Sequence, residues 1–426
     1  WFKNKPCALV VESYRLNSHS KGDDTRSVDV IDNLPDPLKI MAEELAINYK
    51  DFYTVQQNLV NKVWEQVIKL ENIDYDSITV STEKLNKKSS LNPNLISSSR
   101  VNNEINIAIE SALTNGALFI GEDIKTKWND DDKEYGGAFG VSGGLSEKYE
   151  NVISTSISEA GLVGVAAGFA FKSKKLAIAE VMFADFSSLI VDQLYNGVDK
   201  YHSMFGCEVN IPLLVRTPYG MGKGYGPTHS QSPFELFSSL TSMTVLSYTP
   251  LLSYNRILER IGSSGKSAII FEPKMYYGDR LEVWGKLIHN FTITEHRGLI
   301  ASDFLLSNSN NPKLTVITHG SALKSVLSYI CDSELEADVY VVSELYKHRD
   351  ITSKIKIDIP ICIIEEKNSD YGALITTISN EIILKNFNQR IHTNKPVKCI
   401  PANQNWESNL MISEKVVKEL IDEVLK

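Results

Sequence analysis

Short apolar runs alternate with helical patterns from residue 103 onward, and this alternation constrains the fold more than any other feature of the sequence. Apolar runs stand at residues 117–120, 176–180, 211–216, 244–247 and 268–271, and a helical pattern precedes each of them. Runs of Val, Ile and Leu separated by helices are typical of parallel strands that are buried on both faces. The sequence therefore predicts an α/β fold around a parallel sheet.

A second, smaller set of strands and helices follows the polar stretch at residues 307–312. Strands are expected at 314–318, 339–343 and 361–365, and helices at 322–330, 371–384 and 412–425. The same alternation indicates a second α/β domain. We expect the first α/β domain to cover residues 101–295 and the second to cover residues 296–426.

The first hundred residues have a different texture. A strand pattern at 5–12 precedes a polar loop, and residues 37–72 carry apolar side chains at three- and four-residue spacing, as in an amphipathic helix. Ten of the eighteen residues at 86–103 are Ser or Asn, which leaves too few apolar groups to fix a structure. We therefore expect a linker at 76–100, after an N-terminal segment at 1–75.

Charge, hydropathy and cysteine content disfavour several classes of partner. The net charge of −9 repels nucleic acid, and no stretch approaches the roughly 18 apolar residues of a membrane helix. The five cysteines include no Cys-x-x-Cys pair, which favours reduced thiols in a cytoplasmic compartment. The chain begins with Trp1 rather than Met, so we expect a preceding segment. A targeting sequence in that segment would place the protein in the mitochondrial matrix instead.

Two acidic residues stand where a ligand of an α/β fold would lie. Glu122 follows the strand expected at 117–120, and ligands of open α/β sheets collect at the carboxyl ends of strands. Glu159 lies three residues after Ser156 at the start of a helix, a spacing that also fits a capping box. A solvated loop explains Glu122 and a helix cap explains Glu159, so neither residue alone identifies a site.

A glycine-rich loop at residues 218–227 leads into His229. Its glycines match neither nucleotide-binding fingerprint, so both a mobile active-site loop and an ordinary surface loop fit it. Ser232 and Pro233 form a strong helix start, with Ser232 as the N-cap. His229 would then precede the positive end of a helix, where a histidine can accept or donate a proton. A polar loop histidine is the alternative.

A polar loop near the N-terminus combines Arg15, His19 and Ser20 with the acidic pair Asp23 and Asp24. The guanidinium group of Arg15 could bind a phosphate. An exposed loop with a surface ion pair explains the same residues, so this segment alone does not indicate a function.

Taken together, these segments resemble the thiamine diphosphate-dependent 2-oxo acid dehydrogenases, the decarboxylating components of lipoyl-linked complexes. The matching pieces are Gly-Glu-Asp at 121–123, Gly-Gly-Ala-Phe-Gly-Val-Ser-Gly-Gly-Leu at 136–145, Ser-Ile-Ser-Glu-Ala-Gly at 156–161, Phe-Ala-Asp-Phe at 183–186, His-Ser-Gln-Ser-Pro at 229–233 and Ile-Phe-Glu-Pro-Lys at 270–274. Residues 101–426 resemble the whole β subunit. Residues 5–75 resemble the C-terminal tail of the α subunit, through Tyr-Arg at 14–15 and His-Ser-x-x-Asp-Asp at 19–24. The branched-chain members look closest.

The resemblance implies a transketolase-like fold, with a pyrimidine-binding domain, a transketolase C-terminal domain and a short α-type tail. It implies thiamine diphosphate and Mg²⁺ as cofactors. The α-type Gly-Asp-Gly…Asn motif, which binds Mg²⁺ and through it the diphosphate, is absent from this sequence. We therefore expect a separate α-type subunit, or a fused half before Trp1, to supply that part of the site, and we assign no metal ligand here.

The resemblance also implies catalytic roles for three side chains. Glu159 would be the carboxyl group that faces a ring nitrogen of the cofactor's aminopyrimidine, a role that requires burial. His229 and His19 match the family histidines that handle protons and guide acyl transfer. These roles depend on the resemblance and not on the spacing of the residues.

Further residues would bind the cofactor, by the same resemblance. Arg15 matches a diphosphate contact, Ile157 an apolar side chain near the cofactor ring, and Phe186 an aromatic group against the pyrimidine. Glu122 and Glu180 match acids on the path that couples two active sites. Ser20 occupies the place of a phosphorylated serine in mitochondrial members.

We therefore expect part of an enzyme that decarboxylates a 2-oxo acid and passes the acyl group to a lipoyl-bearing acyltransferase. Gly161, Gly164 and Gly168 leave a bare helix face that favours close packing in a homodimer or an α2β2-like assembly. One alternative is an acyloin-forming or biosynthetic decarboxylase with another acyl acceptor, and a second is a non-catalytic scaffold. Met182 and Phe186 replace polar residues of the branched-chain enzymes, which leaves the acyl specificity open.

Overall fold

The computed structural model describes residues 16, 26–69, 89–125, 136–346, 350–385 and 391–426. Its contacts divide the chain into two units, residues 1–79 and residues 80–426. Each unit is described by itself below. None of the helices in the described ranges is both long and apolar enough to cross a lipid bilayer.

The first unit contains the helices α1 (Val28–Asp32), α2 (Pro37–Glu44) and α3 (Tyr49–Ile68). The expected helical stretch at 37–72 is therefore interrupted. Ala46 has a φ of 54°, which ends α2, and the Asn48 side chain accepts hydrogen bonds from the amides of Lys50 and Asp51 to start α3. The strand expected at 5–12 lies outside the described residues.

The first sheet of the second unit has seven strands in the order β11-β5-β6-β4-β3-β1-β2. Their bounds are β11 (Glu344–Leu345), β5 (Thr244–Ser247), β6 (Ala268–Pro273), β4 (Leu213–Tyr219), β3 (Ala177–Glu180), β1 (Leu118–Glu122) and β2 (Val152–Thr155). All are parallel except β11, which runs antiparallel to β5. The prediction of a parallel α/β sheet is thus confirmed, with the five expected strands adjacent to one another at its centre.

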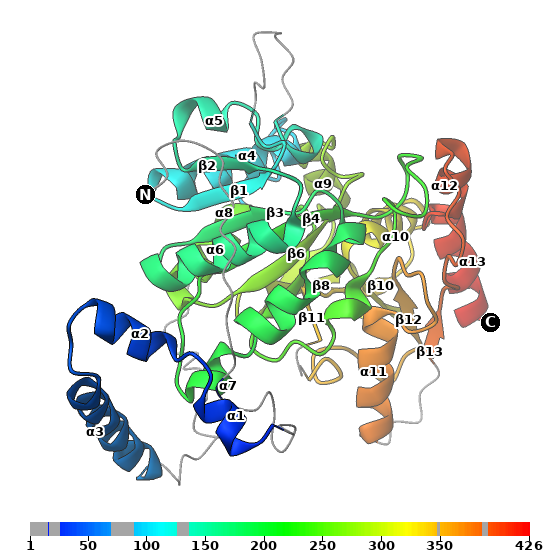
Figure 1. Ribbon diagram of the computed structural model, residues 1–426. Helices are drawn as coiled ribbons and strands as arrows, with labels where there is room; N and C mark the ends of the chain where they lie inside the picture. Colours follow the sequence, from blue (N-terminus) through cyan, green and yellow to red (C-terminus); the bar gives the residue numbers. More distant parts are fainter. Residues whose placement is uncertain (1–15, 17–25, 70–88, 126–135, 347–349, 386–390) are drawn as a thin grey trace. The chain divides into compact units, whose positions relative to one another are not determined.

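Helices cover both faces of this sheet (Figure 1). Alternate strand residues such as Phe119, Ile178 and Leu214 share one core cluster with residues of α4 (Val101–Thr114) and α8 (Tyr254–Ser264). Their strand neighbours share a second cluster with residues of α6 (Glu159–Ser173). Because side chains alternate across a strand, these clusters lie on opposite faces, and the strands are apolar throughout for that reason.

The second sheet has six strands in the order β13-β12-β9-β10-β8-β7. Their bounds are β13 (Ile391–Thr393), β12 (Ile361–Ile364), β9 (Leu314–Thr318), β10 (Ala337–Val341), β8 (Ser302–Ser307) and β7 (Thr292–Arg297). The first four are parallel to one another. β8 runs antiparallel to β10, and β7 runs antiparallel to β8. Helices α10 (Leu323–Asp332) and α13 (Glu414–Val424) share one core cluster with strands of this sheet, and α11 (Ala373–Leu384) shares the other.

Shorter elements lie in the connections between the strands and the longer helices. They are η3 (Ala138–Gly140), α5 (Leu145–Lys148), η4 (Ala184–Ile190), η5 (Gln193–Val198), α7 (Tyr201–Phe205), η6 (Phe234–Phe237), α9 (Leu281–Leu287), η7 (Gly320–Ala322) and α12 (Gln404–Leu410). The single helix expected around 187–203 is instead the succession of η4, η5 and α7, of 3₁₀, π and α type. Gly197 within it disfavours a continuous α-helix.

Residues 89–100 belong to the folded unit, contrary to the linker that their serines and asparagines predict. Leu91 forms a bridge with Leu252, and the Asn92 amide donates hydrogen bonds to the Pro250 carbonyl (3.1 Å) and to Glu104 Oε2 (2.7 Å). Leu95 is buried. Polar side chains fix this stretch because their partners lie elsewhere in the chain, which composition alone does not reveal.

Candidate active site

Glu122 and Glu159 meet at the carboxyl edge of the first sheet. Glu122 ends β1, and Glu159 is the first residue of α6. The amide of Ser158, the N-cap of α6, donates a hydrogen bond to Glu122 Oε1 at 3.0 Å. Both glutamates are buried, with 6% and 8% of their surface exposed. This is the edge at which open α/β sheets bind their ligands.

The capping box expected between Ser156 and Glu159 does not form. The helix begins two residues later than that arrangement requires, so Glu159 is its first residue and Gly161 occupies the third position. Glu122, from β1, accepts the Ser158 amide instead. Glu159 is therefore not held by a side-chain cap, although an acid in the first turn also suits the positive end of the helix.

Electrostatics distinguish this pair of acids from ordinary surface carboxylates. Burial and the neighbouring charge of Glu159 raise the pKa of Glu122, while the Ser158 amide opposes the rise. Among the described residues, the carboxyl group of Glu159 has no hydrogen-bond or ion-pair partner. The Glu159 carboxyl group therefore keeps hydrogen-bonding capacity that a ligand could use.

An aromatic cluster with a histidine lies on segments that follow β3 and β4. Phe186 belongs to η4, an element that packs against α6. The ring of His229 lies edge-on to Phe183 and Phe186, with ring centroids 4.8 and 5.2 Å away. Ile157, next to Ser158, is 83% exposed. The structure thus places Ile157 beside the glutamates and joins Phe186 to His229.

His229 is half-buried and held by polar contacts at both ends. Its Nδ1 lies 2.9 Å from Thr228 Oγ1, and its carbonyl accepts a hydrogen bond from Lys274 Nζ at 2.6 Å. Burial lowers the pKa of Lys274 to about 8, although nearby carboxylates, Glu407 first among them, oppose the shift. Lys274 also lies 5.7 Å from the ring centroid of Phe183. The backbone of His229 is therefore fixed from the buried side.

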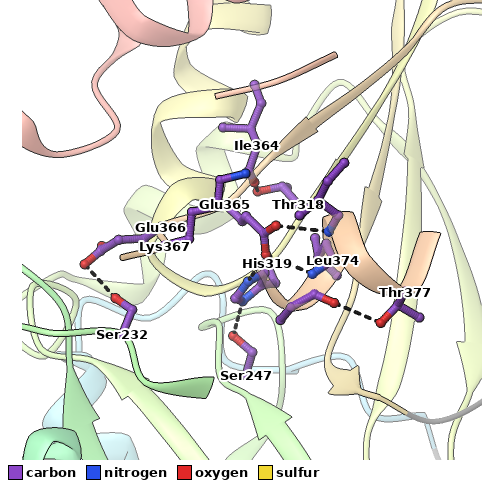
Figure 2. A network of polar contacts seen from close by, with 12 residues as sticks. Ser232, Ser247, Thr318, His319, Ile364, Glu365, Glu366, Lys367, Leu374 and Thr377 are labelled. Carbon is purple, nitrogen blue, oxygen red and sulfur yellow. Dashed lines mark hydrogen bonds and ion pairs between the residues drawn. The ribbon is translucent and has the colours of Figure 1, made fainter. Parts of the chain in front are cut away.

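Ser232 does not cap a helix, contrary to the sequence-based expectation. Its amide donates to Asn368 Oδ1 at 2.6 Å, and its hydroxyl donates to Glu366 Oε1 at 3.0 Å, a contact visible in Figure 2. The element that follows is the short 3₁₀ helix η6, with no side-chain cap. The helix-dipole argument for His229 therefore does not apply.

Glu180 forms a buried ion pair. Its carboxylate accepts hydrogen bonds from Arg216 Nη1 and from the Ala138 amide (2.7 Å), and Arg216 also bonds both oxygens of Glu272 (3.0 and 2.6 Å). Burial raises the pKa of Glu180, and the charge of Arg216 opposes the rise. A cation and an amide thus engage Glu180 directly, unlike Glu122 and Glu159.

A second buried network, drawn in Figure 2, has the residue types of a hydrolase triad. Ser247 Oγ lies 2.8 Å from His319 Nδ1, and His319 Nε2 lies 3.4 Å from Glu365 Oε2. Burial raises the pKa of Glu365, but His319 and the amides of Leu374 and Ile375 outweigh it, so the pKa is lowered. At most 1% of these three side chains is exposed, so no substrate reaches the serine, and the network holds the two sheets together.

Some predicted site residues lie outside the described residues, namely Arg15, His19 and Ser20. Within the described ranges, His, Cys, Asp and Glu side chains form no group of three or more that could hold a metal ion. The residues that the structure does bring together are Glu122 with Glu159, and Phe186 with His229.

Sequence reasoning missed the residues that fix the glycine-rich loop. The amides of Gly222, Gly224 and Gly226 all donate to the carboxylate of Glu407, at 2.8, 2.7 and 2.9 Å. Glu407 lies on α12, in a stretch with no motif around it. The only hint in the sequence was the alternation of the glycines, because glycines at every second position place their backbone amides on the same side of the loop, where one acceptor can bind them all.

Comparisons with known proteins agree with this architecture. Residues 107–279 match the family described as "Transketolase, pyrimidine binding domain". One relative is the acetoin:2,6-dichlorophenolindophenol oxidoreductase subunit beta of Bacillus subtilis, 35% identical over 42% of this chain and 54% of its own length. Another is the mitochondrial 2-oxoisovalerate dehydrogenase subunit beta of Dictyostelium discoideum, 32% identical over 43% of this chain and 47% of its own length.

A solved structure also shares the fold. The protein titled "Split gene transketolase, inactive beta4 tetramer" superposes with a TM-score of 0.53, at 13% identity, over 76% of this chain and 97% of its own. The chain spans about half the length of the curated relatives it matches. The names of those relatives refer to acetoin and to 2-oxoisovalerate, so they do not single out the branched-chain type.

Three observations indicate the same kind of domain. They are the acid pair at the end of β1, the parallel sheet covered on both faces and the match over residues 107–279. Residues 107–279 therefore form a domain of the transketolase pyrimidine-binding type, and this part of the chain is similar to beta subunits named for acetoin oxidoreductase and 2-oxoisovalerate dehydrogenase.

Proposed function

We propose that this chain supplies the pyrimidine-binding half of a thiamine diphosphate-dependent active site that decarboxylates a 2-oxo acid. The observation that carries the proposal is the carboxyl group of Glu159, a residue only 8% exposed, which has no partner among the described residues and lies beside Glu122. Thiamine diphosphate, when bound, supplies the carbon nucleophile and the electron sink that decarboxylation requires.

The residues around Glu159 fit the pyrimidine end of that cofactor. Glu159 offers a carboxyl group for a hydrogen bond to a ring nitrogen, and exchange of a proton there is general acid–base chemistry. Glu122 accepts the Ser158 amide at the start of the same helix and so helps to fix the backbone that carries Glu159. Exposed Ile157 offers an apolar surface to a ring, and Phe186 offers an aromatic one.

We assign His229 to proton transfer at the substrate. Its imidazole projects from a fixed backbone into a cluster of phenylalanines, and the Thr228 hydroxyl contacts its Nδ1. A ring held this way keeps one orientation, which is what a proton-transferring histidine needs. His19 would act with it and Arg15 would contact the diphosphate, both from the α-type tail.

The proposal requires an α-type half, separate or fused, that binds Mg²⁺ and the diphosphate. It also includes a lipoyl-bearing acyltransferase as the acyl acceptor and a homodimeric or α2β2-like assembly. Gly161, Gly164 and Gly168 are consistent with such an assembly, because all of them lie on α6 and the position of a Cβ at Gly164 or Gly168 is open space.

The decisive experiment is Glu159→Gln in the protein isolated with its partner subunit. Glutamine keeps the size of the side chain but cannot exchange the proton, so CO₂ release from pyruvate and 2-oxoisovalerate should fall about a hundredfold or more. The thermal midpoint should stay near that of the wild type. Glu150→Gln, at an exposed position, is the control and should keep full turnover. Wild-type turnover in Glu159→Gln would refute the assignment.

A second candidate function is suggested by the acetoin-linked name of one relative: reaction at an acyloin, with an acceptor other than a lipoyl group. The two functions differ in the acceptor. Supplying a lipoyl domain should accelerate 2-oxo acid turnover if the first is correct. Turnover of acetoin with an artificial electron acceptor, and no response to the lipoyl domain, would favour the second.

A further inference from the structure

The glycine-rich loop is built around a single buried carboxylate. Gly222, Gly224 and Gly226 direct alternate amides toward Glu407, whose side chain is completely buried. A fourth donor, the hydroxyl of Ser230, reaches Glu407 Oε1 at 2.7 Å. Four donors on one carboxylate form a strong, charge-assisted anchor.

Glycine is required at these positions for two physical reasons. Gly222, Gly224 and Gly226 have φ values of 105°, 79° and 81°, in the region that side chains disfavour. A Cβ on Gly224 would also lie 2.6 Å from the backbone nitrogen of Gln404, and one on Gly226 would lie 2.9 Å from Ala402 Cβ. The loop therefore closes directly onto the chain that carries Glu407.

The anchor extends to His229 through its neighbour Ser230. The Ser230 hydroxyl, which bonds Glu407, also accepts a hydrogen bond from Lys274 Nζ at 3.1 Å. The same Lys274 nitrogen donates to the His229 carbonyl. Glu407, Ser230 and Lys274 thus form one continuous network that ends on the backbone of His229.

We infer that Glu407 is a positioning residue that sets the loop from Gly222 to Ser230 and, through it, the imidazole of His229. The catalytic part of this inference rests on the proposed function, because it takes His229 to transfer protons. Burial raises the pKa of Glu407, but the amides of Gly224 and Gly226 outweigh it and lower the pKa, so the group is a carboxylate at neutral pH.

The test compares Glu407→Gln with Glu423→Gln, an exposed position on α13. A glutamine at 407 places an N–H donor against donating amides, so at least one loop amide loses its acceptor. Hydrogen exchange at Gly222, Gly224 and Gly226 should then accelerate about tenfold or more in Glu407→Gln. Glu423→Gln should exchange like the wild type, and unchanged exchange in Glu407→Gln would overturn the inference.

The position of His229 is measured separately, by NMR of histidine labelled at the ring carbon Cε1. The signal of His229, assigned by its loss in His229→Asn, should move in Glu407→Gln because the ring leaves the edges of Phe183 and Phe186. The signals of the other seven histidines should stay. A general loss of stability would move them all, and an unmoved His229 signal would overturn the inference.

Turnover then connects the anchor to the reaction. In the protein assembled with its partner subunit, kcat of Glu407→Gln should fall about tenfold or more with little change in KM, since the ring is misplaced and not removed. A displaced His229 signal with unchanged kcat would contradict the positioning role. If Glu159→Gln keeps full turnover, the proposed function fails, whereas the exchange and NMR results still decide the placement of His229 independently.

Discussion

Two sets of buried acids at the carboxyl edge of the first sheet differ in what surrounds them. Glu180 and Glu272 share Arg216, and the guanidinium group bonds carboxylate oxygens of both. Within the described part of the chain, Glu122 and Glu159 have no such cation. Among the described residues, Glu122 accepts only the Ser158 amide and Glu159 accepts nothing. The first set is completely buried, whereas 6% of Glu122 and 8% of Glu159 remain exposed, so the second set is also the more accessible one.

The difference lies in whether the protein itself completes the hydrogen bonding of the acid. A fully satisfied carboxylate is part of the scaffold, because its free energy is recovered within the fold. An acid that no cation contacts keeps hydrogen-bonding capacity for a ligand, as Glu159 does among the described residues. The first set therefore supports the sheet, and the second set is the candidate for chemistry.

Removing the cation of the scaffold set should have the largest effect. Arg216→Met leaves Glu180 and Glu272 buried without the cation that pairs with both, which should lower the free energy of unfolding by about 3–5 kcal/mol. Urea titration would measure this. Arg280→Met, which removes a surface ion pair with Glu282, is the matched control and should change stability by less than about 1 kcal/mol. Equal effects of the two substitutions would contradict the distinction between scaffold and surface.

A third kind of acid, satisfied by an amide alone, should show an intermediate effect. Burial raises the pKa of Glu104 to about 7, and the hydrogen bond from Asn92 only partly opposes it. The pKa of Glu104 is higher in the folded state than in the unfolded state. Ionisation of this one group therefore costs no stability below about pH 4.5 and lowers the free energy of unfolding as the pH rises to about 7. Glu104→Gln keeps the acceptor for Asn92 and removes the titration.

The Glu104 variant should match the wild type at low pH and exceed its stability by about 3 kcal/mol at pH 8. Thermal midpoints across this range would show the divergence. Glu110→Gln, on the exposed side of the same helix, should give a curve parallel to the wild type. If the Glu104 variant follows the wild type at every pH, burial does not raise the pKa of Glu104.

The smallest effect is expected at the candidate site itself. Glu122→Gln keeps an oxygen for the Ser158 amide and removes the repulsion with Glu159, so stability should rise by less than about 1 kcal/mol. The gain should appear only as the pH rises through the range where Glu122 ionises, because its pKa is raised in the folded state. A clear destabilisation at neutral pH would place Glu122 with the scaffold acids.

The sequence predicted the first sheet well and the second less completely. The central strands are continuous apolar runs, and such runs are recognisable locally. Strands β7 and β8 were both missed. β7 is half-exposed, and its pattern, Thr-Ile-Thr-Glu-His-Arg, offers little apolar signal. The second sheet begins at β7, slightly before the expected boundary at 295/296.

The candidate site was predicted in part. The residue types of Glu122, Glu159, Phe186 and His229 were recognised through their motifs, and the structure brings them together in pairs. Their local explanations failed, since Ser156 forms no capping box and Ser232 caps no helix. In both segments the bonds that form instead reach partners distant in sequence: the Ser158 amide donates to Glu122, and the Ser232 hydroxyl donates to Glu366.

The sequence by itself determined the alternation of strands and helices and the family resemblance, because period, run length and motif order are properties of the local chain. Only the tertiary structure decided which acids are satisfied and which are free. Glu407 meets Gly222 across 185 positions, and Arg216 meets Glu272 across 56. Such contacts depend on how the sheets bring distant strand ends together, and packing of the whole core sets that arrangement.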